Sequence, residues 1–361
     1  MFADRCFSRE WIVQEARRQG TQAVVLEKCI HALLLVGRLR ATGLDFVFKG
    51  GTSLMLHLEP IRRLSIDVDI ASLEPLEKVQ QAMDLVCDGA HFVRWAHQDW
   101  RNAEDPPTKY FQLFYTSALD GTESSVQLDV LEIANGYAQV LEKPVRTSFL
   151  EVLTPMTAPV PTIEGLLGDK LAAFAPSTIG VLYQPVSRRS GEPTEPKPIR
   201  VMKQLFDVGE LFTHSKDMDL VAETYRTHFD QQNSYRGGGF TLDQALEDSI
   251  DAAYWLSQID FKPVEENDKT TFFRRGHTAI NTHLIGERYT LQHAKVSAAR
   301  AALLATAIKT DRLEIVRELP PVEVLRGLRI EGRWSKLQVL RNTSPEAFYL
   351  WYQAHLLDRG V

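Results

Sequence analysis

Hydrophobic positions follow two different periods along the first half of the chain. Residues 22–41 place apolar side chains at helical spacing, and residues 46–48 form a short apolar run. Residues 66–70 alternate strictly between apolar and acidic side chains, the pattern of a half-buried strand. A helix near 75–88 and strands near 91–95, 110–116 and 125–133 follow. This order predicts an α+β fold that begins with a mixed-sheet domain over residues 1–158.

The second half of the chain changes to helical spacing. A helix near 162–175 follows Pro159 and Pro161, with Thr162 as its expected N-cap. The next stretch, 176–198, carries five prolines and predicts a mobile loop. Further helices are predicted at 200–213, 217–229, 242–258, 273–286, 291–309 and 345–358, with a glycine-rich break at 236–239. We therefore expect a mainly helical domain over residues 159–361.

Two carboxylates, Asp67 and Asp69, lie two residues apart in the strand predicted at 66–70. Residues at this spacing point to the same face of a strand, so both carboxylates are expected opposite the buried apolar side chains. Two close carboxylates repel each other unless a cation lies between them, and magnesium binds carboxylate oxygens while keeping waters and substrate phosphates. A solvated acidic pair at a strand edge is the alternative.

A glycine turn precedes this strand and strengthens the metal interpretation. Lys49 and Gly50-Gly51 connect a strand to a short helix predicted at 53–58, with Thr52 and Ser53 at its start. Glycines let backbone N–H groups approach a phosphate, and the start of a helix favours an anion. The alternative is a turn that needs glycine for its dihedral angles alone. The combination with Asp67 and Asp69 favours a phosphate site.

A third carboxylate is expected on another strand of the same sheet. In the strand at 125–131, Val126, Leu128 and Val130 face the core, so Asp129 faces the opposite side. Three carboxylates can hold two magnesium ions about 4 Å apart, one activating the attacking hydroxyl and one clamping the triphosphate. The alternative is that Asp129 is an ordinary polar residue on a solvated face of the sheet.

Two lysines and an aspartate in the helical half are further candidates. Lys170 lies on the apolar stripe of the helix at 162–175, where its stem either snorkels to solvent or carries the ammonium into a cleft to meet a triphosphate. Lys203 and Asp207 lie one turn apart on the next helix. They are either part of the functional site or a solvated ion pair that contributes little to folding stability.

Several of these segments resemble the AbiEii/AbiGii (MenT-like) toxin family of nucleotidyltransferases over about residues 45–212. The first family motif is similar to Lys49-Gly50-Gly51-Thr52-Ser53-Leu54 and Arg63-Leu64-Ser65-Ile66-Asp67-Val68-Asp69-Ile70. The helix-borne lysine of the family resembles that of Asp169-Lys170-Leu171-Ala172-Ala173, and its K-x-x-x-D segment resembles Lys203-Gln204-Leu205-Phe206-Asp207-Val208.

The resemblance implies a nucleotidyltransferase-fold toxin of a bacterial toxin–antitoxin or phage-defence system. Such an enzyme transfers a nucleoside monophosphate from an NTP to an RNA acceptor, by resemblance the 3′ end of a tRNA, and has a separately encoded antitoxin. Magnesium would be held by Asp67, Asp69 and Asp129, and the cleft would include Lys170 and Asp207. The expected nucleotide contacts are Lys49, Gly50, Gly51, Thr52, Ser53, Ser65, Lys170 and Lys203.

Composition agrees with a globular protein and adds a charge asymmetry. The chain is 44% hydrophobic and 24% charged, with a net charge of −6. Residues 291–361 contain eleven Lys and Arg against seven Asp and Glu, about +4, which leaves about −10 elsewhere. This charge asymmetry has two explanations: a surface that binds a polyanion, or a helical tail with solvated charges. The basic residues favouring RNA are Arg188, Arg189, Lys197, Arg200, Lys203, Arg312, Arg326, Arg329, Arg333 and Arg341.

Other classes of site and location are disfavoured. The three cysteines are far apart and form no C-x-x-C, which argues against a zinc site or a disulfide framework and is compatible with the reducing cytoplasm. The N-terminal residues lack the apolar core of a secretory signal, so we expect a cytoplasmic protein without a membrane contact. The competing functions are a nucleotidyltransferase that modifies a small molecule or a protein hydroxyl, and a non-catalytic NTP-binding module. An enclosed pocket would favour the small molecule, and an extended basic groove would favour RNA.

Overall fold

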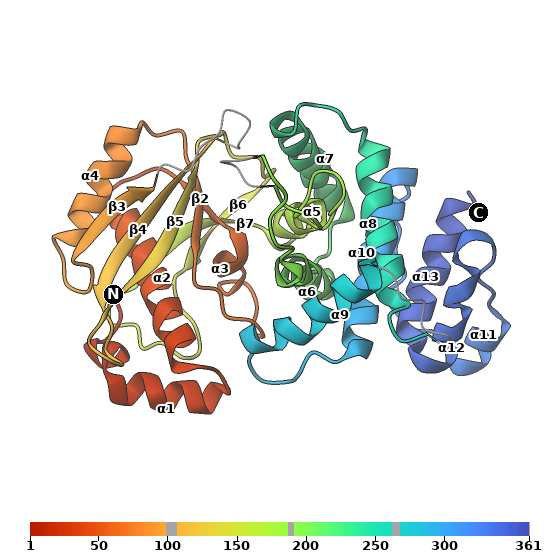
Figure 1. Ribbon diagram of the computed structural model, residues 1–361, viewed down its shortest axis with the longest axis horizontal. Helices are drawn as coiled ribbons and strands as arrows, with labels where there is room; N and C mark the ends of the chain where they lie inside the picture. The colour runs from red at the N-terminus through yellow and green to blue at the C-terminus, as the bar shows by residue number, and fades with distance from the viewer. Residues whose placement is uncertain (99–106, 187–190, 262–267, 361) are drawn as a thin grey trace. The chain divides into compact units, whose positions relative to one another are not determined.

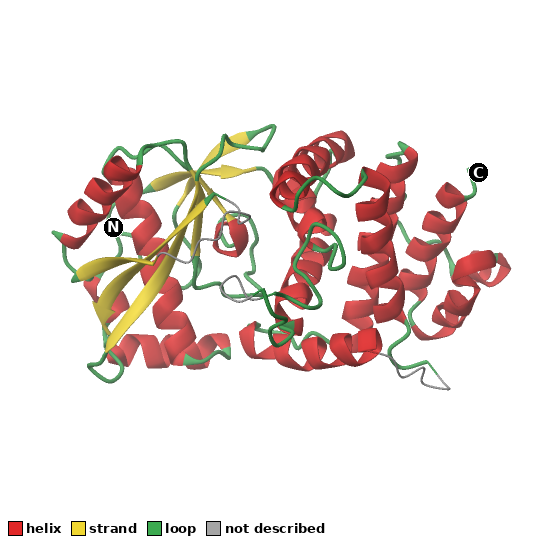
Figure 2. Ribbon diagram, turned by 45° about the horizontal axis from the view of Figure 1, so that its top comes forward, coloured by secondary structure: helices red, strands yellow, loops and turns green. Residues whose placement is uncertain are grey.

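The chain folds into two compact units in a computed structural model that describes residues 1–98, 107–186, 191–261 and 268–360. The sheet unit comprises Met1–Leu166 and Thr282–Arg288, and the helical unit comprises Leu167–Asn281 and Tyr289–Val361. The sheet unit contains all the named strands, and the helical unit is built from helices (Figure 2). The predicted α+β fold, with a mixed sheet followed by a helical part, is therefore confirmed.

A five-stranded mixed sheet forms the centre of the sheet unit, in the order β1-β2-β5-β4-β3. The pair β2–β5 is parallel, whereas the other neighbouring strands are antiparallel (Figure 1). The strands are β1 (Val47–Lys49), β2 (Val68–Ala71), β3 (Arg94–Gln98), β4 (Thr108–Thr116) and β5 (Glu123–Leu131). Each lies within a few residues of its predicted position. Because β2 and β5 are neighbours, side chains at equal register on them lie side by side.

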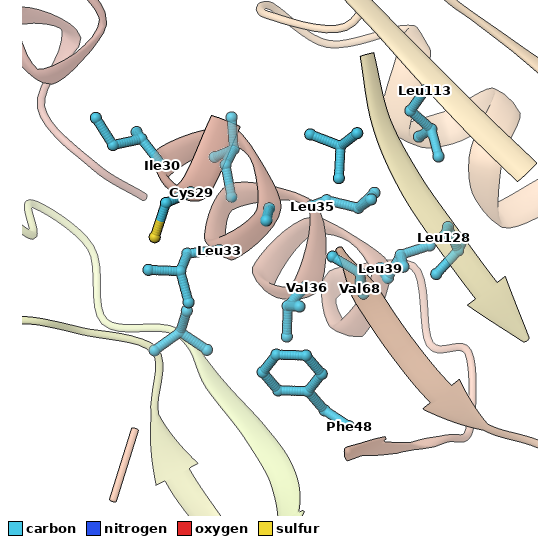
Figure 3. Packing of buried hydrophobic residues seen from close by; sticks show 14 of the residues in the cluster. Cys29, Ile30, Leu33, Leu35, Val36, Leu39, Phe48, Val68, Leu113 and Leu128 are labelled. Carbon is cyan, nitrogen blue, oxygen red and sulfur yellow. The ribbon is translucent and has the colours of Figure 1, made fainter. Parts of the chain in front are cut away.

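The core lies between this sheet and helix α2 (Ala23–Ala41). Leu35, Val36 and Leu39 of α2 lie beside Phe48, Val68 and Leu128 of the strands (Figure 3). The helix also packs against α1 (Arg9–Gln19), α4 (Leu76–Cys87) and the strand β7 (Thr157–Pro161). Contacts on several sides explain why α2 is apolar around most of its circumference rather than along a single stripe.

The sequence did not predict the two-stranded sheet of β6 (Val140–Pro144) and β7 (Thr157–Pro161). Pro159 and Pro161, expected to precede a helix, lie within β7, where their register partners are Glu142 and Val140. Proline cannot donate a ladder hydrogen bond, but an edge strand tolerates it. Helix α5 (Ile163–Ala173) then begins, and the Thr162 hydroxyl accepts a hydrogen bond from the Gly165 amide at 3.1 Å. The predicted N-cap is confirmed.

The helical unit is organised around α10 (Leu291–Thr310), which packs against α6, α8 and α13. Alanines such as Ala298, Ala302 and Ala305 are fully buried in α10, and small side chains let helices approach closely. On α6, an added Cβ at Gly209 would lie 2.2 Å from the Ser297 hydroxyl of α10. The other helices are α6 (Pro198–His214), α7 (Met218–Tyr235), α8 (Leu242–Ser257), α9 (Asp268–Ile280), α11 (Val322–Gly327), α12 (Leu340–Thr343) and α13 (Pro345–Asp358). None of the described helices is long and apolar enough to cross a membrane.

Candidate active site

Three charged residues lie in one row across β1, β2 and β5. Lys49 is the register partner of Asp69 in the antiparallel pair, and Asp69 is the register partner of Asp129 in the parallel pair. Neighbouring strands lie about 4.8 Å apart, so these half-buried side chains are immediate neighbours on the face opposite the α2 core. The predicted place of Asp129, on another strand of the sheet that carries Asp69, is confirmed.

Asp67 does not share the strand with Asp69, contrary to the sequence prediction. Strand β2 begins at Val68, and Asp67 is an exposed residue just before it. The backbone upstream is paired elsewhere: the Leu64 amide donates to the His283 carbonyl, and the Ile285 amide donates to the Arg62 carbonyl. The Thr52 hydroxyl donates to the Asp67 carbonyl and ties this residue to the glycine turn.

The glycine turn lies directly against Asp69. Gly50 has φ +74°, the left-handed region, and a Cβ placed on it would lie only 2.0 Å from Asp69 Oδ2. Glycine is therefore needed here both for the backbone conformation and for the approach of the carboxylate. Helix α3 (Gly50–Leu54) begins three residues earlier than predicted and has only five residues. A helix this short contributes little macrodipole, so the backbone amides themselves are the candidate anion donors.

The hydroxyl groups of Thr52 and Ser53 are used inside the turn. Both residues are fully buried, and Ser53 Oγ donates to the Gly50 carbonyl at 2.9 Å. Their side chains therefore stabilise the turn, and only their backbone amides remain as proposed contacts for a nucleotide.

The carboxylate pair has the chemistry of a magnesium site. Among the described residues, no three His, Cys, Asp or Glu side chains gather as a ready metal site. Magnesium, however, uses one or two carboxylates and completes its shell with water and substrate phosphate, so Asp69 and Asp129 fit it as donors. Gln127, two residues before Asp129 on β5, donates from Nε2 to Asp129 Oδ1 at 2.8 Å and orients that carboxylate. The period of a strand places Gln127 on the same face as Asp129, so the alternation along this strand also indicates Gln127.

Lys170, Lys203 and Asp207 belong to the helical unit. Lys170 is 7% exposed on α5, and within the described parts of the chain its ammonium group has no hydrogen-bond or ion-pair partner. Its predicted place on the buried stripe is confirmed. The helix is held close to α7, because a Cβ at Gly168 would lie 2.7 Å from the Val221 carbonyl oxygen. On α6, Asp207 is 1% exposed and Lys203 is half-buried, so they do not form a solvated surface pair.

Many basic residues of the C-terminal helices are already neutralised. Arg333 forms ion pairs with Glu247 at 2.7 Å and with Asp358 at 2.6 Å, and Arg300 pairs with Glu346 at 2.7 Å. The net charge of residues 291–361 therefore overstates the charge available to a polyanion. Arg312 is exposed and donates to the Gly360 carbonyl. Arg188 and Arg189 lie outside the described residues.

Three arginines near the end of α11 remain without an ion pair in the described structure. The Arg326 carbonyl accepts hydrogen bonds from Arg329 Nη1 at 3.1 Å and from Arg341 Nη1 at 2.8 Å. Two guanidinium groups thus converge on the backbone oxygen of Arg326, which is itself an exposed residue. We call these three residues the arginine cluster.

Comparisons with known proteins give a family match and distant likenesses to solved structures, including two from Helicobacter pylori. The sequence pattern of the family described as nucleotidyl transferase AbiEii toxin, Type IV TA system, matches residues 34–284. No curated protein matches the chain. JHP933 from Helicobacter pylori is 16% identical, covering 81% of this chain and 94% of its own, with a TM-score of 0.42. A putative nucleotidyltransferase from H. pylori is 15% identical, covering 80% of this chain and 96% of its own, with a TM-score of 0.43.

Proposed function

Because the chain belongs to the AbiEii family of nucleotidyl transferase toxins of type IV toxin–antitoxin systems, we propose that it transfers a nucleoside monophosphate from an NTP to an RNA acceptor. The observation that carries the proposal is the row of Lys49, Asp69 and Asp129 beside the left-handed turn at Gly50. A carboxylate pair that binds a cation, next to the backbone amides of a glycine turn, is an arrangement suited to a triphosphate.

In this proposal Asp69 and Asp129 hold magnesium, with Asp67 as an exposed additional ligand. The bound metal would neutralise phosphate charge and lower the pKa of the attacking hydroxyl. The amides of the turn at 50–53, the Ser65 hydroxyl and the Lys49 ammonium bind the phosphates. Lys170 and Lys203 of the helical unit are proposed as further phosphate contacts, and Asp207 as a positioning residue. The acceptor hydroxyl forms the new P–O bond, and pyrophosphate leaves.

The arginine cluster supports RNA as the acceptor. Like charges that converge repel each other, and a polyanion relieves that repulsion by binding them. Each phosphate neutralised releases counterions, so the affinity for RNA would depend steeply on salt. We propose a tRNA 3′ end as the acceptor and a separately encoded antitoxin as the partner that controls the enzyme.

The acceptor is tested with purified protein, magnesium, total tRNA and each NTP labelled at the α-phosphate. We expect label in the RNA with at least one NTP. Label in a protein or a small molecule, with none in RNA, would instead assign the enzyme to that other acceptor.

The contribution of the arginine cluster is measured by filter binding of tRNA at several salt concentrations. Replacing all three arginines by alanine should weaken binding and flatten the plot of log K against log salt by about 2 to 3 units. Arg333→Ala is the matched control, because its guanidinium is already paired with carboxylates. An unchanged slope in the triple variant would remove this support for RNA.

A further inference from the structure

The two glycines of the turn make room for side chains of opposite charge. The space beside Gly50 holds the Asp69 carboxylate, whereas the space beside Gly51 holds a guanidinium. A Cβ on Gly51 would lie 2.6 Å from Arg63 Nη2 and 2.9 Å from Ser65 Oγ. Contacts below 3.0 Å are too close for a carbon atom, so any side chain at position 51 would displace Arg63 or Ser65.

Space explains the glycine at position 51. Gly51 does not have the positive φ of Gly50, so its backbone conformation is open to other residues. Arg63 is 8% exposed, and burying a guanidinium is costly unless polar or charged groups surround it. Arg63 Nη1 donates a hydrogen bond to the Leu64 carbonyl at 3.5 Å, and the guanidinium is held against the turn rather than extended into solvent.

A distant segment fixes the backbone that carries Arg63. Arg63 forms an isolated antiparallel bridge with Leu284, and the hydrogen bonds at Leu64 and Ile285 continue it on both sides. Residues 282–288 belong to the sheet unit although more than a hundred residues separate them from Arg63 in the chain. This pairing holds Arg63 and the neighbouring Ser65 next to the turn independently of the local sequence.

We propose that Arg63 binds a phosphate group of the nucleotide at this turn, together with the Ser65 hydroxyl; the inference rests on the proposed function. The turn would then have two sides. The Asp69 carboxylate beside Gly50 would bind the metal, and the Arg63 guanidinium beside Gly51 would bind the phosphate. Arginine suits this role because its planar, permanently charged fork donates two parallel hydrogen bonds to a phosphate.

The first test is the affinity of full-length protein for an NTP and for the corresponding nucleoside, measured by calorimetry with magnesium. Arg63→Met should raise the Kd for the NTP about tenfold or more and leave the Kd for the nucleoside unchanged. Arg63→Lys should recover part of the loss, because it keeps the charge but not the fork. Equal NTP affinity of the wild type and Arg63→Met would overturn the inference and leave the proposed function standing. Absence of NTP binding by the wild type would overturn both.

A second test guards against a variant that only misfolds. Gly51→Ala keeps both side chains but places a methyl group where the guanidinium lies, so it should weaken NTP binding about tenfold. In an Arg63→Ala background the contact with the guanidinium is absent and only the contact with Ser65 Oγ remains, so the same change should cost less than about threefold, because the effects of contacting residues are not additive. Additive effects of the two substitutions would contradict a shared role at the phosphate.

Discussion

Substitution of Gly50 by alanine separates the two roles of this glycine. Its φ of +74° costs a residue with a Cβ about 1 to 2 kcal/mol of folding stability. In addition, the new Cβ would lie 2.0 Å from Asp69 Oδ2, whereas an ordinary contact begins near 3.4 Å. The carboxylate must therefore move by roughly 1.4 Å, the difference between these distances. A displacement of about 1 Å at a reacting centre lowers a rate on the order of a hundredfold.

The matched control is Gly43→Ala. Gly43 has φ +80°, and no atom lies within 4 Å of the place that its Cβ would take. Both variants should lose about 1 to 2 kcal/mol of unfolding free energy in urea. Only Gly50→Ala should lose about a hundredfold in the rate of nucleotidyl transfer. Equal rates in the two variants would refute the argument that Gly50 is required by the carboxylate of Asp69.

Two further predictions concern buried charge. Lys170→Ala should raise the KM for the NTP about tenfold without lowering the melting temperature, because the buried ammonium group has no hydrogen bond or ion pair to lose among the described residues. Unfolding of the variant would assign Lys170 a structural role. Burial lowers the pKa of His31 from 6.5 to about 4, so the unfolded chain takes up a proton first and stability falls as pH drops from 6.5 to 4. The wild type should therefore lose about 2 kcal/mol more unfolding free energy between pH 7.5 and pH 5 than the variant His31→Phe, which keeps an aromatic ring stacked on Tyr115. An equal loss in the two proteins would contradict this prediction.

Local periodicity was sufficient to predict the position and orientation of the elements that face a core on one side. The alternation in β5 gave the correct orientation of Asp129, because Val126, Leu128 and Val130 are buried and a strand has a period of two. Helical spacing located α2, α4 and most helices of the helical unit within a few residues. The buried place of Lys170 followed from the same spacing.

Features that depend on distant segments could not be predicted from local pattern. The bridge between Arg63 and Leu284 joins residues far apart in the chain, so neither the late start of β2 nor the exposed position of Asp67 was visible in the alternation of 66–70. Strand β7 contains two prolines, and the sequence indicated only that they precede a helix. The contact of Gly51 with Arg63 depends on that same bridge, so the sequence indicated a phosphate site or a tight turn at Gly51 but not the neighbouring guanidinium.

The proposed nucleotidyl transfer depends on the carboxylate pair of Asp69 and Asp129. Its most direct test follows the two ends of one NTP, labelled at the α-phosphate or at the γ-phosphate, with wild-type protein and Asp69→Asn in magnesium. The wild type should move the α-label to the acceptor and release the γ-label as pyrophosphate. A correctly folded Asp69→Asn variant should do both on the order of a thousandfold more slowly, because it loses a ligand for the cation that offsets phosphate charge. Transfer of the γ-label to the acceptor, or a near-normal rate in Asp69→Asn, would contradict the account.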